Sequence, residues 1–592
     1  MYILGTSFFY HDSAAALIQD GELIAAADQE RFSRKKHDSG FPSQAIAFCL
    51  AQAGITADDL DYVVFYEKPL TKFERILMTS LGTFPRSWES FSEAMVTWFD
   101  QKLWIKTLIQ EKVGIPADKV LFTDHHMSHA ASALFCSPYE QAAIMTVDGV
   151  GEWTTMTLGQ GRASWQDGAD NEITLFSEQR FPHSIGLLYS AFTAFLGFKV
   201  NNGEYKVMGM APYGQPKYLD QVYKILKVQS DSSFSLDMDY LSYHYSPTKS
   251  FNSRFVQLFG EPRVPESEFF TVDTDPDLDP DDPAVKKNQH YADVAASIQR
   301  ATEDTLLKMA NYLYEKTGLD KLCMAGGVAL NSVANGRILR ETPFQEVFIQ
   351  PAAGDSGGAL GAALYVYHVL LKKPRAFVME HAYWGQGYAQ DEIRSWLERN
   401  SVAYTYVADD AALCAQLADE LEQGKVIGWF QGRFEWGPRA LGNRSILADP
   451  RRADMKHIVN EKIKFRELFR PFAPAVLEER SGEFYGVRAP EQHYPPRYML
   501  MVFSVPEDKQ AIVPATTHQG GTARIQTVRR EWNPLYYDII AAFHERTGVP
   551  VLLNTSFNLR GEPIVDSPAD AFKTFSNSGI DTLMLDHFLI QK

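Results

Sequence analysis

The segment from residue 433 to 470 concentrates positive charge in an acidic protein. It holds ten Lys/Arg and five Asp/Glu, whereas the whole chain of 592 residues has a formal net charge of −17. Such a local excess favours a small bound polyanion, because guanidinium groups fork onto phosphate oxygens. A solvated basic face is the alternative. Gly, Pro, Trp and Phe interleave the cations, which suits a folded pocket better than an exposed helix face.

A second group of residues could bind a metal ion. His125 and His129 stand four residues apart in TDHHMSHAASALF, a spacing that puts both imidazoles on one face of a helix. Asp148 and Asp355 follow apolar runs and are flanked by glycines, as are carboxylate ligands at strand ends of α/β folds. Two histidines with one carboxylate leave coordination positions open and suit Fe(II) or a similar ion. Either aspartate could instead only cap a turn.

Further candidates lie at a glycine turn and near the N-terminus. Gly326-Gly327 with Asn331 has the character of a nucleotide contact, because glycines allow close backbone approach and a following helix N-terminus favours anions. His11 ends the first predicted strand, and Lys36 lies in ERFSRKKHD after the third. A histidine at a strand end could take a proton from an acceptor hydroxyl. The alternative is a structural histidine and a solvated lysine.

The elements that must position these residues are those of an α/β protein. Residues 1–67 predict three strands with an Asp20-Gly21 hairpin turn, a helix over 43–54 and a fourth strand. Three more strands over 142–181 repeat this start and indicate a duplicated α/β domain with a cleft between its halves. A long helix over 291–317, a strand LCMA, a strand EVFIQ and a helix over 358–371 complete it.

The rest of the chain predicts an insertion and a second α/β unit. Residues 227–290 are polar and rich in Asp and Pro, and their six aspartates between 273 and 282 indicate a surface insertion rather than a calcium loop. The apolar segment 68–110 either lines an acceptor pocket or packs as core, and we favour core. The pattern resets at about 372–380, where we place the domain boundary. The second unit contains the basic segment and the runs VIGWF, ARIQTV and VLLNTSF.

Composition excludes several classes of protein. The acidic balance argues against broad binding of nucleic acid or anionic membranes. No run of residues approaches the ~18 apolar positions that a membrane span requires. The four cysteines are far apart and form no metal pair or disulfide framework, so a reduced cytoplasm fits best. The first residues lack the basic leader of a signal peptide.

With these residues collected, the chain resembles the carbamoyltransferase family that includes the Nod-factor, cephamycin and nebramycin O-carbamoyltransferases (NodU/CmcH/TobZ). The resemblance covers nearly the whole chain and rests on eleven segments in family order. These are YHDSAAALI, ERFSRKKH, HHMSHAASA, VDGVGEW, KVMGMAPYG, AGGVALN, PAAGDSGG, GRFEWGPRALGNRS, IKFRELFRPFAP, ARIQTV and NTSFNLRGEPIV.

The resemblance implies a fold and a two-step reaction. Residues 1–372 would form a Kae1-like domain of the actin/sugar-kinase/Hsp70 type, and residues 380–592 a YrdC-like domain. The second domain would join carbamoyl phosphate to ATP, with Mg²⁺, and the first would move the carbamoyl group from carbamoyl-adenylate to a hydroxyl of a small molecule, a secondary metabolite.

The resemblance also implies a role for each candidate residue. The Fe(II) ligands would be His125, His129 and Asp355, and His11 and Lys36 would serve the transfer. Asp148, Gly326, Gly327 and Asn331 would lie at the nucleotide. The residues that hold ATP and carbamoyl phosphate would be Arg439, Arg444, Lys464, Arg470, Arg524 and Ser556, with Lys464 and Arg470 acting in adenylate formation.

Two other functions use similar parts. A tRNA-modifying enzyme that makes threonylcarbamoyladenosine would need a basic surface, and the net charge of −17 argues against it. A nucleotide-binding regulator without chemistry would need fewer cations than the basic segment holds. We therefore expect a cytoplasmic enzyme whose partner is a small hydroxyl acceptor, with neither nucleic acid nor membrane, and leave a homo-oligomer open.

Overall fold

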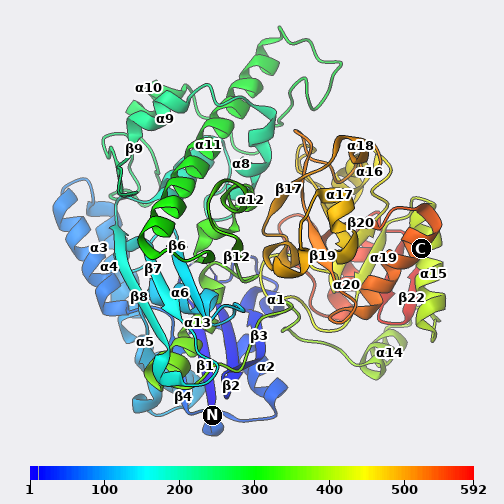
Figure 1. The fold of residues 1–592 in the computed structure, drawn as a ribbon, viewed down its shortest axis with the longest axis horizontal. Coiled ribbons are helices and arrows are strands. Elements are labelled where there is room, and N and C mark those ends of the chain that lie inside the picture. Colours follow the sequence, from blue (N-terminus) through cyan, green and yellow to red (C-terminus); the bar gives the residue numbers. More distant parts are fainter. Residues whose placement is uncertain (11) are drawn as a thin grey trace.

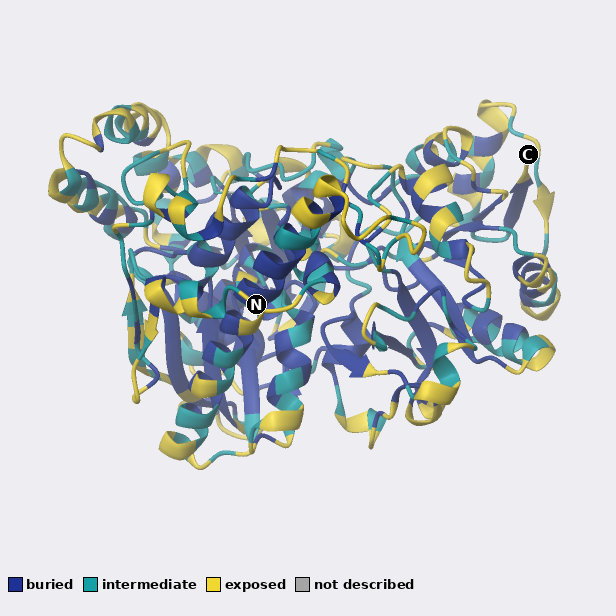
Figure 2. Ribbon diagram, turned by 90° about the horizontal axis from the view of Figure 1, so that it is seen from above, coloured by how far each residue is buried: buried dark blue, intermediate teal, exposed yellow. Residues whose placement is uncertain are grey.

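The structure is a computed structural model and describes residues 1–10 and 12–592; His11 lies outside the described residues. The chain forms two α/β halves side by side, with the N-terminal half on the left of Figure 1 and the C-terminal half on the right. Most strands of each half are buried, and many of the exposed residues lie on the outer helices and loops (Figure 2).

The first sheet has five strands in the order β3-β2-β1-β4-β5. Its first three strands run antiparallel, and β4 and β5 run parallel to β1. Asp20 and Gly21 both have positive φ angles, 51° and 88°, as the predicted two-residue hairpin turn requires. The strands are β1 (Tyr2–Ser7), β2 (Ala14–Gln19), β3 (Glu22–Asp28), β4 (Tyr62–Phe65) and β5 (Val120–Phe122).

The second sheet repeats this topology strand for strand. Its order is β12-β11-β6-β7-β8, with an antiparallel run β6-β7-β8 and with β11 and β12 parallel to β6. The predicted duplication of an α/β domain is therefore confirmed. The strands are β6 (Gln141–Val147), β7 (Thr154–Arg162), β8 (Glu172–Arg180), β11 (Lys321–Ala325) and β12 (Glu346–Phe348).

Two helices pack closely between the sheets. A Cβ on Gly361 of α13 (Asp355–Tyr365) would lie 1.8 Å from the Ser128 carbonyl oxygen of α6 (His125–Leu134). Gly5 of β1 makes an equally close approach to the Ala359 carbonyl oxygen of α13. The helix predicted at 358–371 begins three residues earlier, at Asp355, so this carboxylate lies in the first turn of α13 and not in a loop.

The long predicted helix is α11 (Pro283–Thr317), which begins eight residues before its predicted start. The Asp282 side chain accepts a hydrogen bond from the Ala284 backbone N–H, and Pro283 occupies the first helical position, where proline is favoured. The insertion before it is more regular than its composition indicated. It contains β9 (Leu226–Val228), β10 (Phe234–Leu236) and α10 (Ser253–Phe259).

The preference for core packing in segment 68–110 holds for only part of its large apolar side chains, because eight of them are exposed and the others are buried or half-buried. This segment forms α3 (Pro69–Thr83), α4 (Trp88–Asp100) and α5 (Ile105–Val113), at the left edge of the molecule in Figure 1. Trp98 is buried. The exposed large apolar side chains are Leu70, Met78, Leu81, Phe84, Trp88, Val96, Phe99 and Trp104.

The C-terminal half contains an eight-stranded mixed sheet in the order β13-β22-β21-β14-β15-β20-β16-β19. The run ARIQTV is divided between β18 (Thr522–Arg524), which pairs with β17 (Val502–Ser504), and the large sheet. The strands of the large sheet are β13 (Thr405–Tyr406), β14 (Ile427–Phe430), β15 (Arg444–Ala448), β16 (Ala473–Leu477), β19 (Gln526–Val528), β20 (Val551–Ser556), β21 (Thr582–Leu585) and β22 (Phe588–Gln591).

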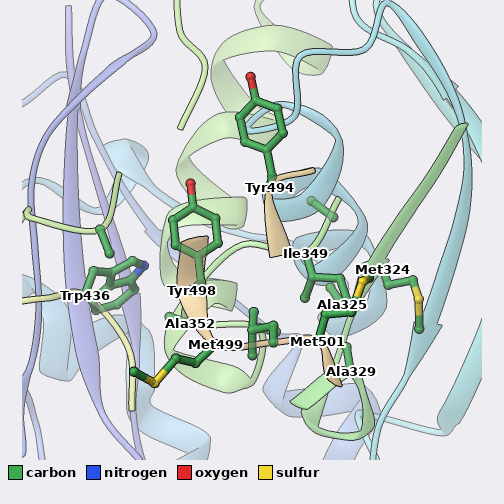
Figure 3. Close-up of a cluster of buried hydrophobic side chains, with 14 of the residues drawn as sticks. Met324, Ala325, Ala329, Ile349, Ala352, Trp436, Tyr494, Tyr498, Met499 and Met501 are labelled. Atoms are coloured by element: carbon green, nitrogen blue, oxygen red, sulfur yellow. The ribbon is translucent and has the colours of Figure 1, made fainter. Parts of the chain in front are cut away.

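The two halves share one hydrophobic core. In Figure 3, Met324 and Ala329 of the N-terminal half lie with Trp436, Tyr498 and Met501 of the C-terminal half in one buried cluster. Polar contacts add to this packing.

Two arginines of the short helix α1 (Gln29–Ser33) and its end make some of these polar contacts. Arg31 donates to the Gly437 carbonyl at 2.9 Å, and Arg34 donates to the Ile564 carbonyl at 2.6 Å. The halves are thus held in a fixed relation by apolar and polar contacts together.

Candidate functional site

Four buried side chains meet in the N-terminal half. His125 and His129 lie on α6, Asp148 follows β6, and Asp355 begins α13. Each offers a ligand atom that lies within 4.8 Å of the other three. The His125 Nε2 is 2.9 Å from an Asp148 oxygen and 3.6 Å from an Asp355 oxygen, and the two Nε2 atoms are 3.1 Å apart.

These four groups fit a divalent metal ion. Imidazole nitrogens and carboxylate oxygens form the donor set of non-haem iron sites, and all four residues are buried. Although burial opposes charge, hydrogen bonds to Asp148 and Glu67 raise the pKa of His125 well above its usual value. Burial raises the pKa of Asp148, but His125 and His129 outweigh it and hold that pKa well below its usual value. A positive charge is thus already favoured between the carboxylates.

Residues around the cluster orient its members. Glu67 accepts from the Lys72 ammonium at 2.6 Å and lies 3.6 Å from the His125 Nδ1. Although burial opposes it, Lys72 and His125 hold the pKa of Glu67 at about 2. Glu152 accepts a hydrogen bond from the His125 backbone N–H at 3.0 Å. Such partners fix the ring orientation of metal-binding histidines. None of Glu67, Lys72 and Glu152 was singled out from the sequence.

The glycine turn contacts the same cluster. The second carboxylate oxygen of Asp148 accepts from the Gly327 N–H at 2.9 Å. Gly326 has a φ angle of 96°, and a Cβ there would lie 2.2 Å from the Val147 carbonyl oxygen. Asn331 caps α12 (Ser332–Glu341) with its side chain. The structure therefore joins Asp148 to both the histidine pair and the glycine turn.

Lys36 lies in a separate polar group at the end of α1. Its ammonium donates to Glu30 at 2.7 Å, and the His37 Nδ1 lies 2.9 Å from an Asp12 oxygen. Asp12, Glu30 and His37 also come within the mutual distances that a metal site needs. The predicted base His11 lies outside the described residues.

A second site lies in the C-terminal half, around a buried lysine. The Lys464 ammonium donates to the Ser556 carbonyl at 2.7 Å, to the Ser556 hydroxyl at 3.1 Å and to the Asn558 side chain at 2.7 Å. Burial, followed by Arg466 and Arg470, lowers the pKa of Lys464 well below its usual value. Lys464 and Ser556, both site candidates from the sequence, are thus brought together.

Arg466 and Arg470 act electrostatically on this lysine, and Arg439 and Arg524 lie near these two arginines. Burial and the charges of Arg439, Arg466 and Arg470 lower the pKa of Arg524 well below its usual value. Burial lowers the pKa of Arg439 to about 10, with Arg470 adding to the effect. Among the residues that the structure describes, these five cations have one ion-pair partner, Glu467, which lies 3.5 Å from Arg470.

Arg444 is not part of this cluster. Its five N–H groups point to backbone carbonyls, and its guanidinium lies 3.6 Å from the Phe430 ring centroid. No donor is left for a phosphate, so the structure gives this residue a packing role. The accepting carbonyls belong to Gln386, Gln431, Gly432, Asn443 and Asp566.

Three residues in or beside the cationic cluster were not among the sequence candidates. Arg466 lies in the quoted segment IKFRELFRPFAP, between Lys464 and Arg470, so its charge and position were available signals. Tyr205 and Lys206 come from the other half of the chain. The Tyr205 hydroxyl lies 3.2 Å from Arg470, and Lys206 pairs with Glu467 at 2.8 Å. Only the tertiary structure brings them to the cations.

Known family models match both halves of the chain. The family model described as Carbamoyltransferase N-terminus matches residues 2–364, and the one described as Carbamoyltransferase C-terminus matches residues 418–592. The chain therefore belongs to the carbamoyltransferase family and is a transferase.

Individual proteins are also similar to this chain. An uncharacterized protein of Synechocystis, sll1178, is 46% identical over 100% of this chain and 97% of its own length. The 3'-hydroxymethylcephem-O-carbamoyltransferase of Amycolatopsis lactamdurans is 34% identical over 45% of this chain and 47% of its own. The structure of HypF from T.kodakarensis matches 63% of this chain and 48% of its own at 12% identity, with a TM-score of 0.29, too low to bear on fold or function.

The length and hydropathy of the helices indicate whether any of them could span a membrane. Within residues 1–10 and 12–592, no helix combines the length and the apolar character needed to cross a membrane.

Proposed function

We propose that the protein is an ATP-dependent O-carbamoyltransferase with two reaction sites. The cationic cluster joins carbamoyl phosphate and ATP into carbamoyl-adenylate, and the His/Asp cluster transfers the carbamoyl group to a hydroxyl of a small molecule, a secondary metabolite, in the cytoplasm. The observation that supports this proposal is that the five clustered cations form a single ion pair among the described residues, that of Arg470 with Glu467. Such a cluster needs an anionic ligand of several charges.

The proposed domains follow the two reaction sites. Residues 1–372 form a Kae1-like transfer domain, and residues 380–592 form a YrdC-like domain that makes the adenylate.

The first step brings two polyanions into contact. Lys464, Arg466 and Arg470 offset the repulsion between the phosphates, with Arg439 and Arg524 as further anion-binding groups. Water first splits carbamoyl phosphate into carbamate and inorganic phosphate, which leaves. A carbamate oxygen then attacks the α-phosphorus of ATP, pyrophosphate leaves with its electron pair, and Mg²⁺ bound to ATP assists its departure. The carbamoyl group then rests on AMP, which the transfer site can hold by its nucleotide.

The second step takes place at the other site. His125, His129 and Asp355, together with Asp148, would hold Fe(II) or a similar ion, which supplies Lewis-acid polarisation when bound. The acceptor hydroxyl oxygen bonds to the carbamoyl carbon, its proton passes to His11, and the bond to AMP breaks. Lys36 serves the same step as a cation. The glycine turn Gly326-Gly327 lies beside the nucleotide.

The test is release of pyrophosphate from ATP plus carbamoyl phosphate, followed by mass spectrometry of candidate alcohols for the gain of one carbamoyl group. The division of labour is tested with Lys464→Met. This variant should form no adenylate but should still carbamoylate an alcohol from supplied carbamoyl-adenylate. If wild-type protein splits no ATP in the presence of carbamoyl phosphate, the proposal fails. If supplied adenylate does not rescue the variant, the two-site division is wrong.

A further inference from the structure

Helix α3 carries a buried guanidinium that nothing in the mechanism uses. Arg75 is 7% exposed, and its Nη1 is buried without a hydrogen-bond partner in the described part of the chain. No carboxylate of a described residue forms an ion pair with it. Its guanidinium carbon lies over the Phe181 ring, 5.0 Å from the ring centroid.

Arg75 stands next to the transfer site. Lys72, three residues earlier on the same helix, lies 4.1 Å from the Tyr10 ring centroid and pairs with Glu67. Glu67 in turn contacts His125 of the metal-binding cluster. Burial lowers the pKa of Arg75, and the charges that oppose this effect come from Tyr10, Glu67 and Glu152. The Lys72–Glu67 pair therefore links the helix that carries Arg75 to the metal-binding cluster.

Lys72 has a carboxylate partner, whereas Arg75 has no ion-pair partner among the described residues. The Lys72–Glu67 pair is neutral and closely bonded, with 2.6 Å between nitrogen and oxygen. A buried cation without a partner is strongly destabilising. The planar guanidinium fork matches phosphate, sulfate and carboxylate oxygens in pairs. An anionic group that enters beside α3 would satisfy the Arg75 donors and remove this penalty.

We propose that Arg75 forms an oxyanion-binding subsite beside the His/Asp cluster. Its ligand is either the phosphate of the nucleotide or an anionic group carried by the hydroxyl acceptor, and this choice rests on the proposed function. In the second case the acceptor is an alcohol that also bears a carboxylate, sulfate or phosphate.

A stability measurement separates ligand binding from a packing role. Arg75→Met removes an unpaired buried charge and keeps most of the side-chain volume, so the melting temperature of the ligand-free protein should stay equal or rise. The matched control is Arg375→Met. Arg375 is 3% exposed but donates to the Tyr139 carbonyl at 2.7 Å, so its replacement should lower the melting temperature by several degrees.

Binding measurements then identify the ligand. Calorimetry with the metal-loaded protein compares AMP, adenosine, and sulfate in the presence of saturating AMP. Arg75→Met should weaken one of the two anions by about 10–100-fold, the loss of a charge-assisted hydrogen bond. A loss for AMP with adenosine unchanged assigns the phosphate of the nucleotide. A loss for sulfate with AMP unchanged assigns an anionic acceptor.

The proposal is overturned if Arg75→Met binds both anions as wild type does, or if it melts as early as Arg375→Met. A failure of the proposed function would be detected by a different measurement, the release of pyrophosphate. Pyrophosphate release takes place at the other cluster, so Arg75→Met should leave it unchanged. If the wild-type protein releases no pyrophosphate, the carbamoyl-adenylate route is refuted. The anion-binding measurement would still show whether Arg75 forms the proposed subsite.

Discussion

At the residue scale, both candidate sites contain groups whose charge is held in an unusual state. Lys464 is buried next to Arg466 and Arg470, which lowers its pKa well below the ordinary value. The His125 and His129 rings lie close to two carboxylates, and all four side chains are buried. The charges around Lys464 therefore favour an anionic ligand. The two carboxylates beside the histidines favour a cation.

The lysine should take up a proton when ATP binds. The pKa of Lys464 is depressed in the free protein, and phosphate oxygens nearby favour the charged ammonium, so the pKa rises on binding and protons enter from solvent. We expect uptake of about one proton per ATP at a pH between the two pKa values. Calorimetry over a series of pH values, in buffers of different ionisation enthalpy, measures it.

The matched control is the exposed neighbour Lys462. Lys462→Met should keep the proton uptake, whereas Lys464→Met should lose it and bind ATP more weakly. A binding enthalpy that is independent of the buffer in the wild-type protein would contradict this prediction.

The histidine pair should be required for metal binding, and its neighbour should not. His129→Ala should lower the bound divalent metal, measured by elemental analysis, by more than about tenfold. His126 is buried on the same helix but bonds to the Thr146 hydroxyl and the Thr154 carbonyl, and its pKa is lowered to about 3, mainly by burial. His126→Ala should keep the metal. Equal metal content in the two variants would refute the assignment.

At the scale of elements, the transfer site depends on how closely α6 and α13 approach. Small residues on α13 allow the contact, and Gly361 meets the Ser128 backbone of α6 directly. Asp355 begins α13, and His125 begins α6. Any separation of the two helices therefore moves a carboxylate away from the imidazoles.

Gly361→Ala should test this close approach. The new Cβ would lie 1.8 Å from the Ser128 carbonyl oxygen, so the helices must part at a cost of about 1–3 kcal/mol or more. Thermal unfolding and metal content should both fall. At Gly354, just before α13, a Cβ would meet no atom within 4 Å, so Gly354→Ala should change neither quantity. The prediction fails if the two variants behave alike.

At the scale of the molecule, the halves behave as one packed body. The buried cluster of Figure 3 draws side chains from both, and Tyr205 of the N-terminal half contacts Arg470 of the C-terminal half. The proposed adenylate site is therefore completed by a residue of the other half, which ties the two reactions to a fixed arrangement of the chain.

Thermal unfolding should show that the two halves, which share a core, unfold together. Trp436 is fully buried at the boundary between the halves, whereas Trp88 is 62% exposed on α4. Trp436→Ala should cost about 3–5 kcal/mol and shift a single unfolding transition of the whole chain. Trp88→Ala should change stability by less than about 0.5 kcal/mol. Calorimetry that shows two transitions, of which only one moves, would show independent halves instead.

Local patterns were sufficient for much of this protein. Alternating apolar runs and an Asp-Gly turn predicted the strands and the duplication, because strand period and turn geometry are properties of a few neighbouring residues. The spacing of His125 and His129 and the charge excess around Lys464 likewise identified parts of both sites. Such signals do not depend on how distant segments meet.

Long-range packing decided the rest. The sequence alone could not separate Arg439, which lies in the cationic cluster, from Arg444, whose donors are all used by backbone carbonyls. Nor could it show that Tyr205 reaches Arg470 across the boundary, or that Arg75 is buried without a partner. Whether a charge meets a ligand, a carbonyl or another charge depends on residues hundreds of positions away, and only the folded chain brings these together.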